Sequence, residues 1–333
     1  MAIAKTTINS DLLAIESDGT IAFIGKNLLT EATALTWQRS SSGTLQTYQG
    51  VVADQTDPLK PTTRAFDGRM TIPTACQGTS GQVQWVFFAA WATDQVADSM
   101  LLRINSIARV TDIFVDLDDD AAFSGADSVT RMWACSVGAG NQDLTGDVRI
   151  VYPSNRRWTG IRYLRIAIFT DSTDTPPEIS ECFLGARRTL PWPPNEPWSP
   201  EPYGIDRTQE RPRGRDRARL VNAVGWAEFV GEVTLVDAAY TPASINGASE
   251  VRALWRECGY GNEPVVFWPD TTEPVKAYLC EFEDTVVDLP IVAFSERPWE
   301  FELVELPPFL EGDDRETVIL PNGETSTAYT RGY

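Results

Sequence analysis

The chain contains no histidine among its 333 residues. Serine–histidine and cysteine–histidine nucleophile pairs are therefore excluded, as are histidine-based zinc sites and the commonest general base of enzymes. Carboxylate pairs alone serve glycosidases, so a glycoside hydrolase stays open as a function class. With 47 acidic residues in the chain, the closeness of two of them in sequence selects no catalytic pair, and we assign no catalytic residue.

Lysine and cysteine are also scarce. Only four of the 28 basic residues are lysines. The rest are arginines, whose rigid guanidinium suits fixed contacts at protein interfaces, although a GC-rich genome would give the same bias. The five cysteines form no CxxC pair, which argues against a zinc knuckle or a redox motif. Most of them have apolar neighbours, so we expect buried thiols in a protein that folds in a reducing cytoplasm.

Long apolar runs and repeats are absent as well. No stretch is long enough to cross a bilayer, and the first residues lack the apolar run of a secretory signal, so we expect no membrane insertion. The formal charge of −19 repels phosphate backbones, which argues against nucleic acid recognition. Without a repeat or a coiled-coil heptad, the chain does not have the pattern of a fibre shaft.

What the sequence does contain is a series of short β-type segments. Apolar and polar residues alternate over 33–38, which predicts a strand with one buried and one wet face. Further β-prone segments, separated by polar turns, lie at 83–88, 100–104, 113–115, 148–152 and 162–169. This spacing predicts an antiparallel sandwich or jelly roll over residues 27–190. In the N-terminal segment, 1–26, residues 21–25 could add one strand to either module.

A bridge of different composition spans residues 191–219. Its prolines stiffen the backbone, and bulky aromatic and arginine residues are interspersed among them. A solvated linker is one interpretation, but a linker has little use for two tryptophans, whereas a docking segment does. The expected partner contacts in this connecting strap are Trp192, Trp198, Tyr203, Arg207, Arg211, Arg213, Arg215 and Arg217.

A second module is predicted over residues 220–306. Ser249 can cap a helix over about 249–258 in which apolar residues recur at helical spacing, and Gly259 can end that helix. Strand patterns lie on both sides of this helix, at 226–236, 264–270, 277–282 and 299–303. The remaining residues, 307–333, are expected to form an extended C-terminal tail. The fold class is thus mainly β, with two β-sandwich modules joined by the strap.

The sharpest ionic cluster surrounds a run of aspartates. Asp116, Asp118, Asp120 and Asp127 stand at positions 1, 3, 5 and 12 of a calcium loop. Ala121 stands where an EF-hand has glycine, and the preceding segment is strand-like, so a calcium site in a β-loop is the form this hypothesis takes. The alternative is a solvated acidic loop that binds no metal. No other cofactor is expected.

Eleven tryptophans raise the question of ligand stacking. An aromatic ring can stack on the C–H face of a sugar, but a tryptophan in an alternating strand is more often part of the core. Trp158 lies in a polar segment beside Arg156 and Arg157, which supply hydrogen-bond donors. We therefore expect these three residues to form an exposed glycan-binding site.

The order of these elements resembles the tail-tip (distal-tail-like) or minor tail proteins of long-tailed bacteriophages. The resemblance rests on Y-L-R-I at 163–166, E-I at 178–179 and F-L-G at 183–185, followed by the proline-rich bridge, and covers roughly residues 27–306. It implies that the first module is a galactose- or carbohydrate-binding-like jelly roll. It implies that the second is a tail-tube-like sandwich with one flanking helix.

The resemblance also implies a role. The expected function is that of a structural, non-enzymatic virion component of the tail tip or baseplate, made in the host cytoplasm. Its expected partners are copies of itself, in a ring that is a trimer or hexamer, and other phage tail proteins. The alternative is a protein that binds a host-surface glycan, and a glycoside hydrolase is a third class.

Overall fold

The computed structural model describes residues 21–66, 73–105, 110–124, 131–136, 148–173, 175–190, 201–202, 227–236, 247–268, 277–282, 296–306, 317–319 and 325–327. These residues divide into two compact units. The described residues of Asn27–Arg187 and Asp313–Tyr333 form the first unit, and those of Glu16–Lys26 and Arg188–Gly312 form the second. The chain therefore passes from one unit to the other between Arg187 and Arg188, whereas the sequence places a boundary at residue 190.

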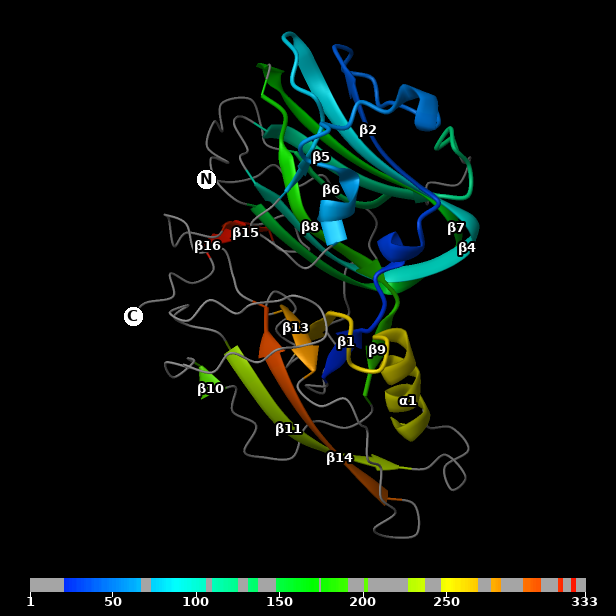
Figure 1. Ribbon diagram of the computed structural model, residues 1–333, viewed down its shortest axis with the longest axis vertical. Helices are drawn as coiled ribbons and strands as arrows, with labels where there is room; N and C mark the ends of the chain where they lie inside the picture. Colours follow the sequence, from blue (N-terminus) through cyan, green and yellow to red (C-terminus); the bar gives the residue numbers. More distant parts are fainter. Residues whose placement is uncertain are drawn as a thin grey trace. The chain divides into compact units, whose positions relative to one another are not determined.

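The first unit is one hydrogen-bonded sheet of nine strands in the described part of the chain (Figure 1). Its strands are β2 (Ala34–Ser40), β3 (Thr74–Ala75), β4 (Gln82–Asn105), β5 (Val110–Asp118), β6 (Arg131–Ser136), β7 (Val148–Thr173), β8 (Glu178–Gly185), β15 (Thr317–Ile319) and β16 (Thr325–Thr327). Short 3-10 helices at Leu28–Glu31, Val51–Ala53 and Thr62–Phe66 lie among them. All strand pairs but one are antiparallel, the exception being β15 against β7.

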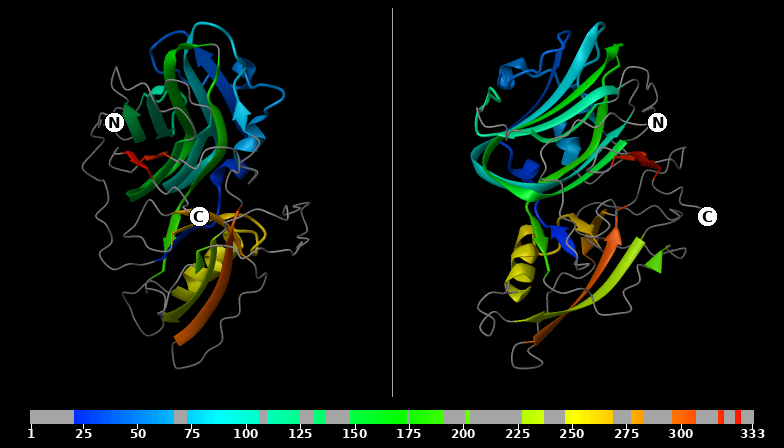
Figure 2. Two further views of the ribbon diagram at one scale, coloured as in Figure 1. Left: turned by 90° about the vertical axis from the view of Figure 1, so that its left-hand side faces the viewer. Right: turned by 180° about the vertical axis from the view of Figure 1, so that it is seen from behind.

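Two long bent strands turn this sheet into a sandwich. Strands β4 and β7 pair along most of their length, with register shifts between Ala90 and Ser99 where both strands curve (Figure 2). On one side of the bend β4 pairs with β2 and β7 pairs with β5, which in turn pairs with β6. On the other side β4 pairs with β8 and β7 pairs with β15. We call the part that contains β2, β5 and β6 the first layer, and the part that contains β3, β8, β15 and β16 the second layer.

The main core of the unit lies between the two layers. Trp85, Phe87 and Ala89 of β4 point into it from the first layer, and Met100, Leu102 and Ile104 point into it from the second. The inward positions change from odd to even numbers because the bulges at the bend shift the alternation of the strand. One pattern of alternation read along the whole segment would place half of these side chains on the wrong face.

The sequence therefore divides each long strand wrongly. Residues 83–88 and 100–104 were expected to be separate strands but both belong to β4, and 148–152 and 162–169 both belong to β7. The polar residues between them occupy the bend, where Gly160 takes a φ of 76°. In the C-terminal segment, the described residues form β15 and β16, which extend the sheet of the first unit.

The second unit is a seven-stranded antiparallel sheet in its described residues, with one helix. Its strands are β1 (Ala22–Ile24), β9 (Arg187–Thr189), β10 (Glu201–Pro202), β11 (Ala227–Val236), β12 (Val265–Trp268), β13 (Tyr278–Phe282) and β14 (Glu296–Glu305), and the helix is α1 (Gly247–Glu257). Residues 21–25 thus contribute their strand here, where β1 pairs with β12. The prediction of a mainly β protein with a flanking helix is confirmed.

Helix α1 packs against this sheet through its apolar face. Val251, Leu254, Trp255 and Cys258 are buried with Phe23 of β1 and with aromatic residues of β12, β13 and β14. The helix ends as predicted, because Gly259 has a φ of 59°. The amides of Gly259 and Tyr260 donate to the carbonyls of Arg256 and Trp255, which is a Schellman motif.

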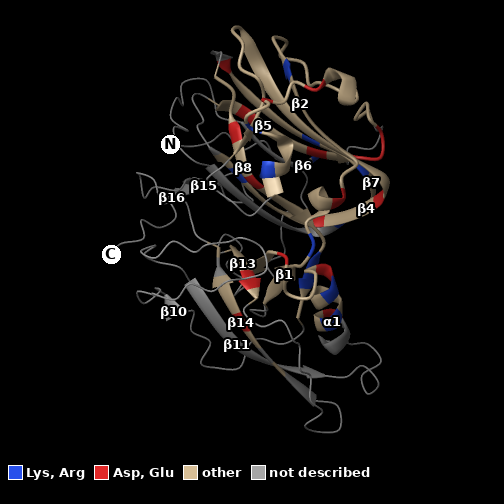
Figure 3. Cartoon of the chain, in the orientation of Figure 1, with Lys and Arg blue, Asp and Glu red and all other residues tan. Residues whose placement is uncertain are grey.

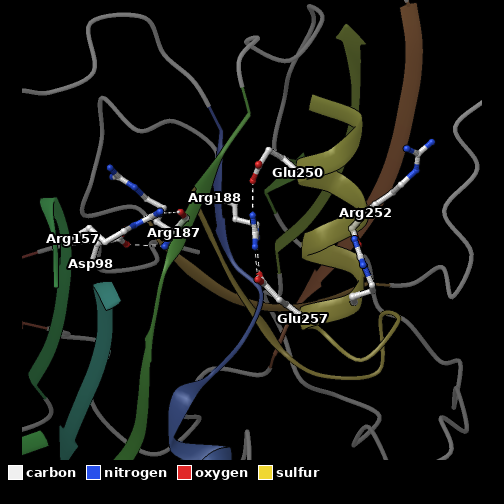
Figure 4. A network of polar contacts seen from close by, with 8 residues as sticks. Asp98, Arg157, Arg187, Arg188, Glu250, Arg252 and Glu257 are labelled. Atoms are coloured by element: carbon white, nitrogen blue, oxygen red, sulfur yellow. Dashed lines mark hydrogen bonds and ion pairs between the residues drawn. The ribbon is translucent and has the colours of Figure 1, made fainter. Parts of the chain in front are cut away.

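Polar contacts fix the helix to β9 at the edge of this sheet. Arg188 donates from Nε to Glu257 and from Nη1 to Glu250, at 2.7 and 2.5 Å (Figure 4). The hydrogen bonds that Arg188 donates to Glu257, and then those to Glu250, raise the pKa of the guanidinium. Figure 3 shows that α1 carries both acidic and basic residues, so the charge on its surface is mixed in sign.

Candidate functional site

The face of the first layer that points away from the main core is the candidate site. We call it the outer face and define it by residues of β2, β4, β5 and β7 whose positions in the ladder are adjacent: Thr36, Gln38, Gln84, Val86, Phe88, Phe114, Asp116, Arg165, Ala167 and Phe169. Its apolar members form a second, smaller hydrophobic cluster. The sequence predicts that the face carrying Thr36 and Gln38 is wet, and this is wrong, since the two residues are 0% and 4% exposed.

A buried charge network crosses the outer face. Arg165 donates to Asp116 Oδ2 from Nε at 2.8 Å and from Nη2 at 2.6 Å, and Arg131 donates to Oδ1 of the same carboxylate at 2.6 Å. The Asp116 side chain is 0% exposed and that of Arg165 6%. The strands make this arrangement possible, because Asp116 of β5 stands directly opposite Arg165 of β7 in the ladder.

The loop of residues 41–50, which we call the cover loop, lies over this face. Leu45 packs against the apolar cluster of the outer face. The carbonyl of Gln46 accepts a hydrogen bond from Arg165 Nη1 at 2.8 Å, and the amide of Tyr48 donates to the carbonyl of Ala121 at 3.0 Å. The outer face is buried because this loop returns across it from the end of β2.

Aromatic rings surround the charge network. The Tyr48 ring lies 5.7 Å from the ring of Phe88 and 5.5 Å from that of Tyr163. Burial, then Tyr163 and Asp54, raise the pKa of Tyr48, so its phenol stays protonated at neutral pH. Phe123 stacks on the Arg165 guanidinium at 4.3 Å. Phe123 also has a φ of 50°, a strained conformation for a bulky residue, and strained residues are concentrated at binding sites.

On the outer face, three buried side chains carry polar atoms that have no hydrogen-bond partner in the described structure. These atoms are the amide oxygen and nitrogen of Gln38, the amide oxygen and nitrogen of Gln84, and the hydroxyl of Thr36. A buried polar group without a partner costs about 1–3 kcal/mol, so a fold rarely keeps several together. Gln38 of β2 stands opposite Val86 of β4, and Gln84 lies two residues before Val86 in the same strand. The side chains of Gln38 and Gln84 therefore lie on one face of the sheet as diagonal neighbours.

The acidic turn after β5 is closed by its own hydrogen bonds. Asp118 Oδ1 accepts from the amide of Asp120, and Asp120 accepts from the amide of Ala122 and the hydroxyl of Ser124. The last two bonds lower the pKa of Asp120, whereas desolvation raises that of Asp118. Both oxygens of Asp116 are taken by arginines, as described above.

Asp127, the fourth expected calcium ligand, lies outside the described residues. Within the described ranges, no three acidic or cysteine side chains gather in a way that would hold a metal ion. The calcium site therefore stays a prediction.

The expected glycan site at Trp158 does not have the exposure that the sequence suggests. Trp158 lies in strand β7 rather than in a polar loop, and its side chain is 6% exposed within the main core. Arg157 donates to Asp98 at 3.1 Å and to the carbonyl of Arg187, all within the first unit (Figure 4). The prediction of an exposed Trp158 platform is wrong. Arg156 belongs to the same strand, and its side chain lies outside the described residues.

The partner contacts expected in the connecting strap cannot be placed. All eight residues, from Trp192 to Arg217, lie outside the described part of the chain, where the strap contributes only the short strand β10. Their role stays a prediction. Among the helices that the structure describes, none has the length and apolar composition needed to span a membrane.

The residues of the outer face were missed in the sequence for an identifiable reason. Gln38 and Gln84 alternate with tryptophans and so resemble solvent-facing positions. One signal was present: Arg165 interrupts the apolar run of β7, and Asp116 interrupts that of β5. Two opposite charges inside buried strands indicate a pair, because a lone buried charge is too costly.

No family model and no curated protein matches the chain. Solved structures with some similarity include a chitosan-binding module from a Paenibacillus chitosanase/glucanase, at 15% identity over 47% of this chain and 97% of the module, with a TM-score of 0.29. A CBM32 module produced by Clostridium perfringens has 8% identity over 48% and 98% of the two chains, with a TM-score of 0.29.

A Ruminococcus gnavus GH29 fucosidase in complex with fucose has 12% identity over 49% of this chain, with a TM-score of 0.31, and the match spans only 27% of the fucosidase. At such identities and TM-scores these likenesses carry no inference about ligand or activity.

Proposed function

We propose that the first unit binds a glycan and that the protein acts by binding rather than by catalysis. The observation that carries this proposal is the outer face itself, where unpaired amides, a fixed arginine–aspartate pair and aromatic rings lie side by side. Ligand sites are mostly apolar and aromatic, with a few polar groups held in place. The outer face has this composition.

The chemistry of the face fits a polyhydroxylated ligand. An amide offers both donors and acceptors, and a sugar hydroxyl needs both. Aromatic rings such as those of Tyr48 and Phe123 suit the C–H face of a sugar ring. The Asp116 carboxylate, by contrast, has both oxygens engaged by arginines, so it is poorly placed to act as a general acid or nucleophile.

Binding of the full chain to an array of purified bacterial surface polysaccharides tests this proposal. We expect retention on at least one polysaccharide and its competition by soluble fragments of the same polymer. Tyr48→Ala should weaken that binding at least tenfold because it removes an aromatic ring from the face. Tyr260→Ala, which changes an exposed tyrosine of the second unit, serves as the matched control and should bind as the unaltered chain does. Absence of retention on every polysaccharide would refute the proposal.

We also propose the tail tip of a long-tailed bacteriophage as the setting of this binding. The order of elements supports it: a sandwich is followed by a proline-rich bridge and then by a sheet with helix α1 packed on one face. In this proposal the protein forms a ring with copies of itself and contacts other tail proteins. Electron microscopy and mass measurement of the purified chain should show trimeric or hexameric rings. A monomer at every concentration, and no label at the tail tip of particles treated with an antibody to the chain, would count against this setting.

A further inference from the structure

We propose that Gln38, Gln84 and Thr36 form an inner subsite for a neutral sugar residue and that the cover loop is the lid of this subsite. The proposal rests on the glycan binding proposed above and specifies where and how it occurs. Two independent observations carry it: the polar atoms that the fold leaves unpaired, and the way in which the loop is held.

The first observation concerns the three side chains. Thr36, Gln38 and Gln84 are 0%, 4% and 0% exposed, and in the described structure the Thr36 hydroxyl and both amides lack a hydrogen-bond partner. Their neighbours on the outer face, such as Val86 and Phe88, are apolar and cannot supply one. Strand positions alone would have accepted apolar residues here. Amides that are buried and unpaired are therefore suited to a ligand that brings its own hydroxyls.

The number and kind of polar atoms indicate the ligand class. Gln38 and Gln84 together offer two acceptor oxygens and two donor nitrogens on one face. Two neighbouring hydroxyls of a hexose can each donate to one amide oxygen and accept from one amide nitrogen. Neither amide carries a charge, and the nearby Asp116 carboxylate is held by Arg165 and Arg131. The two amides therefore match neutral hydroxyls, and for this reason we assign the subsite to a neutral sugar.

The second observation concerns the cover loop. Gly43 and Gly50 lie within it and at its end, a Cβ added at either would meet no atom within 4 Å, and Gly50 has a φ of 79°. The loop is held to the face by the packing of Leu45 and Tyr48 and by the hydrogen bonds of Gln46 with Arg165 and of Tyr48 with Ala121. The glycines within the loop and at its end allow the backbone rotations that release these contacts, so the loop can open.

When the loop opens, the network beneath it stays in place. Arg165 keeps its two hydrogen bonds to Asp116 and loses only the one to the Gln46 carbonyl. The guanidinium Nη1 then faces the ligand with a free donor, and Tyr48 can close over the bound sugar. The loop therefore both excludes water from the subsite and supplies an aromatic ring to it.

The test is a double variant, Gln38→Met/Gln84→Met, which keeps the volume of both side chains and removes the amides. Its binding should be measured by calorimetry with soluble fragments of the polysaccharide that gives the strongest array signal. We expect at least a tenfold loss of affinity with no loss of thermal stability. Gln77→Met, which makes the same change at an exposed glutamine of the first unit outside the outer face and the cover loop, is the control and should bind normally.

The outcomes separate the two proposals. If the double variant binds as tightly as the unaltered chain, the inner subsite is wrong while glycan binding stands. If the unaltered chain binds no polysaccharide, both fall. Hydrogen exchange of residues 41–50 provides a second readout, because their amides should exchange at a rate that drops on addition of the fragments. An unchanged rate in a sample that binds would overturn the role of the loop as a lid.

Discussion

Removal of the Asp116 carboxylate should strongly destabilise the first unit. This group is fully buried and accepts three hydrogen bonds from two arginines. In an Asp116→Ala variant, Arg165 would remain buried with the Gln46 carbonyl and the Phe123 ring as its described contacts. Breaking a buried ion pair by removing one partner costs about 3–5 kcal/mol.

The comparison with an exposed pair makes the prediction specific. Asp94 and Arg162 form a 2.7 Å ion pair in the same unit, with side chains 63% and 49% exposed. Water screens an exposed pair, so Asp94→Ala should have little effect although it removes the same charge. For a unit of this size, about 1 kcal/mol shifts Tm by roughly 2–4 °C. Asp116→Ala should therefore lower Tm by about 6–20 °C.

Thermal unfolding of both variants, followed by near-ultraviolet circular dichroism, measures this difference. A further variant, Asp116→Leu/Arg165→Met, removes both charges and should recover part of the loss, since the cost comes from the unpaired guanidinium. The reasoning is refuted if Asp116→Ala and Asp94→Ala unfold within about 4 °C of each other.

Two further predictions concern packing and thiol chemistry. Gly25→Ala should destabilise the second unit by about 1–3 kcal/mol, because the new Cβ would lie 2.5 Å from Leu254 Cδ1, whereas Gly43→Ala meets no atom within 4 Å and should be neutral by the same urea titration. An equal effect of the two changes would contradict the packing. Burial raises the pKa of the Cys76 thiol to about 12 and that of Cys258 to about 11, so almost no thiolate is present at pH 8. Iodoacetamide at that pH should label the buried cysteines Cys76, Cys182, Cys258 and Cys280 in urea and leave them unlabelled in the folded protein. Labelling of the folded chain at these positions, read by peptide mass spectrometry, would show that the thiols are accessible.

The secondary structure of the second unit follows from local patterns. The spacing of Val251, Leu254 and Trp255 predicts helix α1, and the alternation around Trp299 predicts β14. Both patterns are local, since the residues that produce them lie within a few helical turns or strand residues of one another. For this reason α1 and β14 can be predicted from the sequence alone.

In the first unit, local patterns predict strands but do not predict which of their side chains are buried. The alternation in β2 predicts the strand but assigns Gln38 to solvent, because burial of that face depends on the cover loop and on no residue of β2. Trp158 has polar neighbours in sequence and apolar neighbours in space, since the bend of β7 turns it into the core. The candidate site is formed by contacts between distant segments, which periodicity cannot show.

The shared strands of the sandwich also bear on how the first unit forms. Strands β4 and β7 run through both layers, so one pairing event aligns the two layers together. The entropic cost of closing the intervening chain is therefore incurred once for both layers, whereas a sandwich of separate strands would incur it for each layer. Neither layer can melt alone without breaking the backbone ladder at the bend, and folding of this unit should be all-or-none.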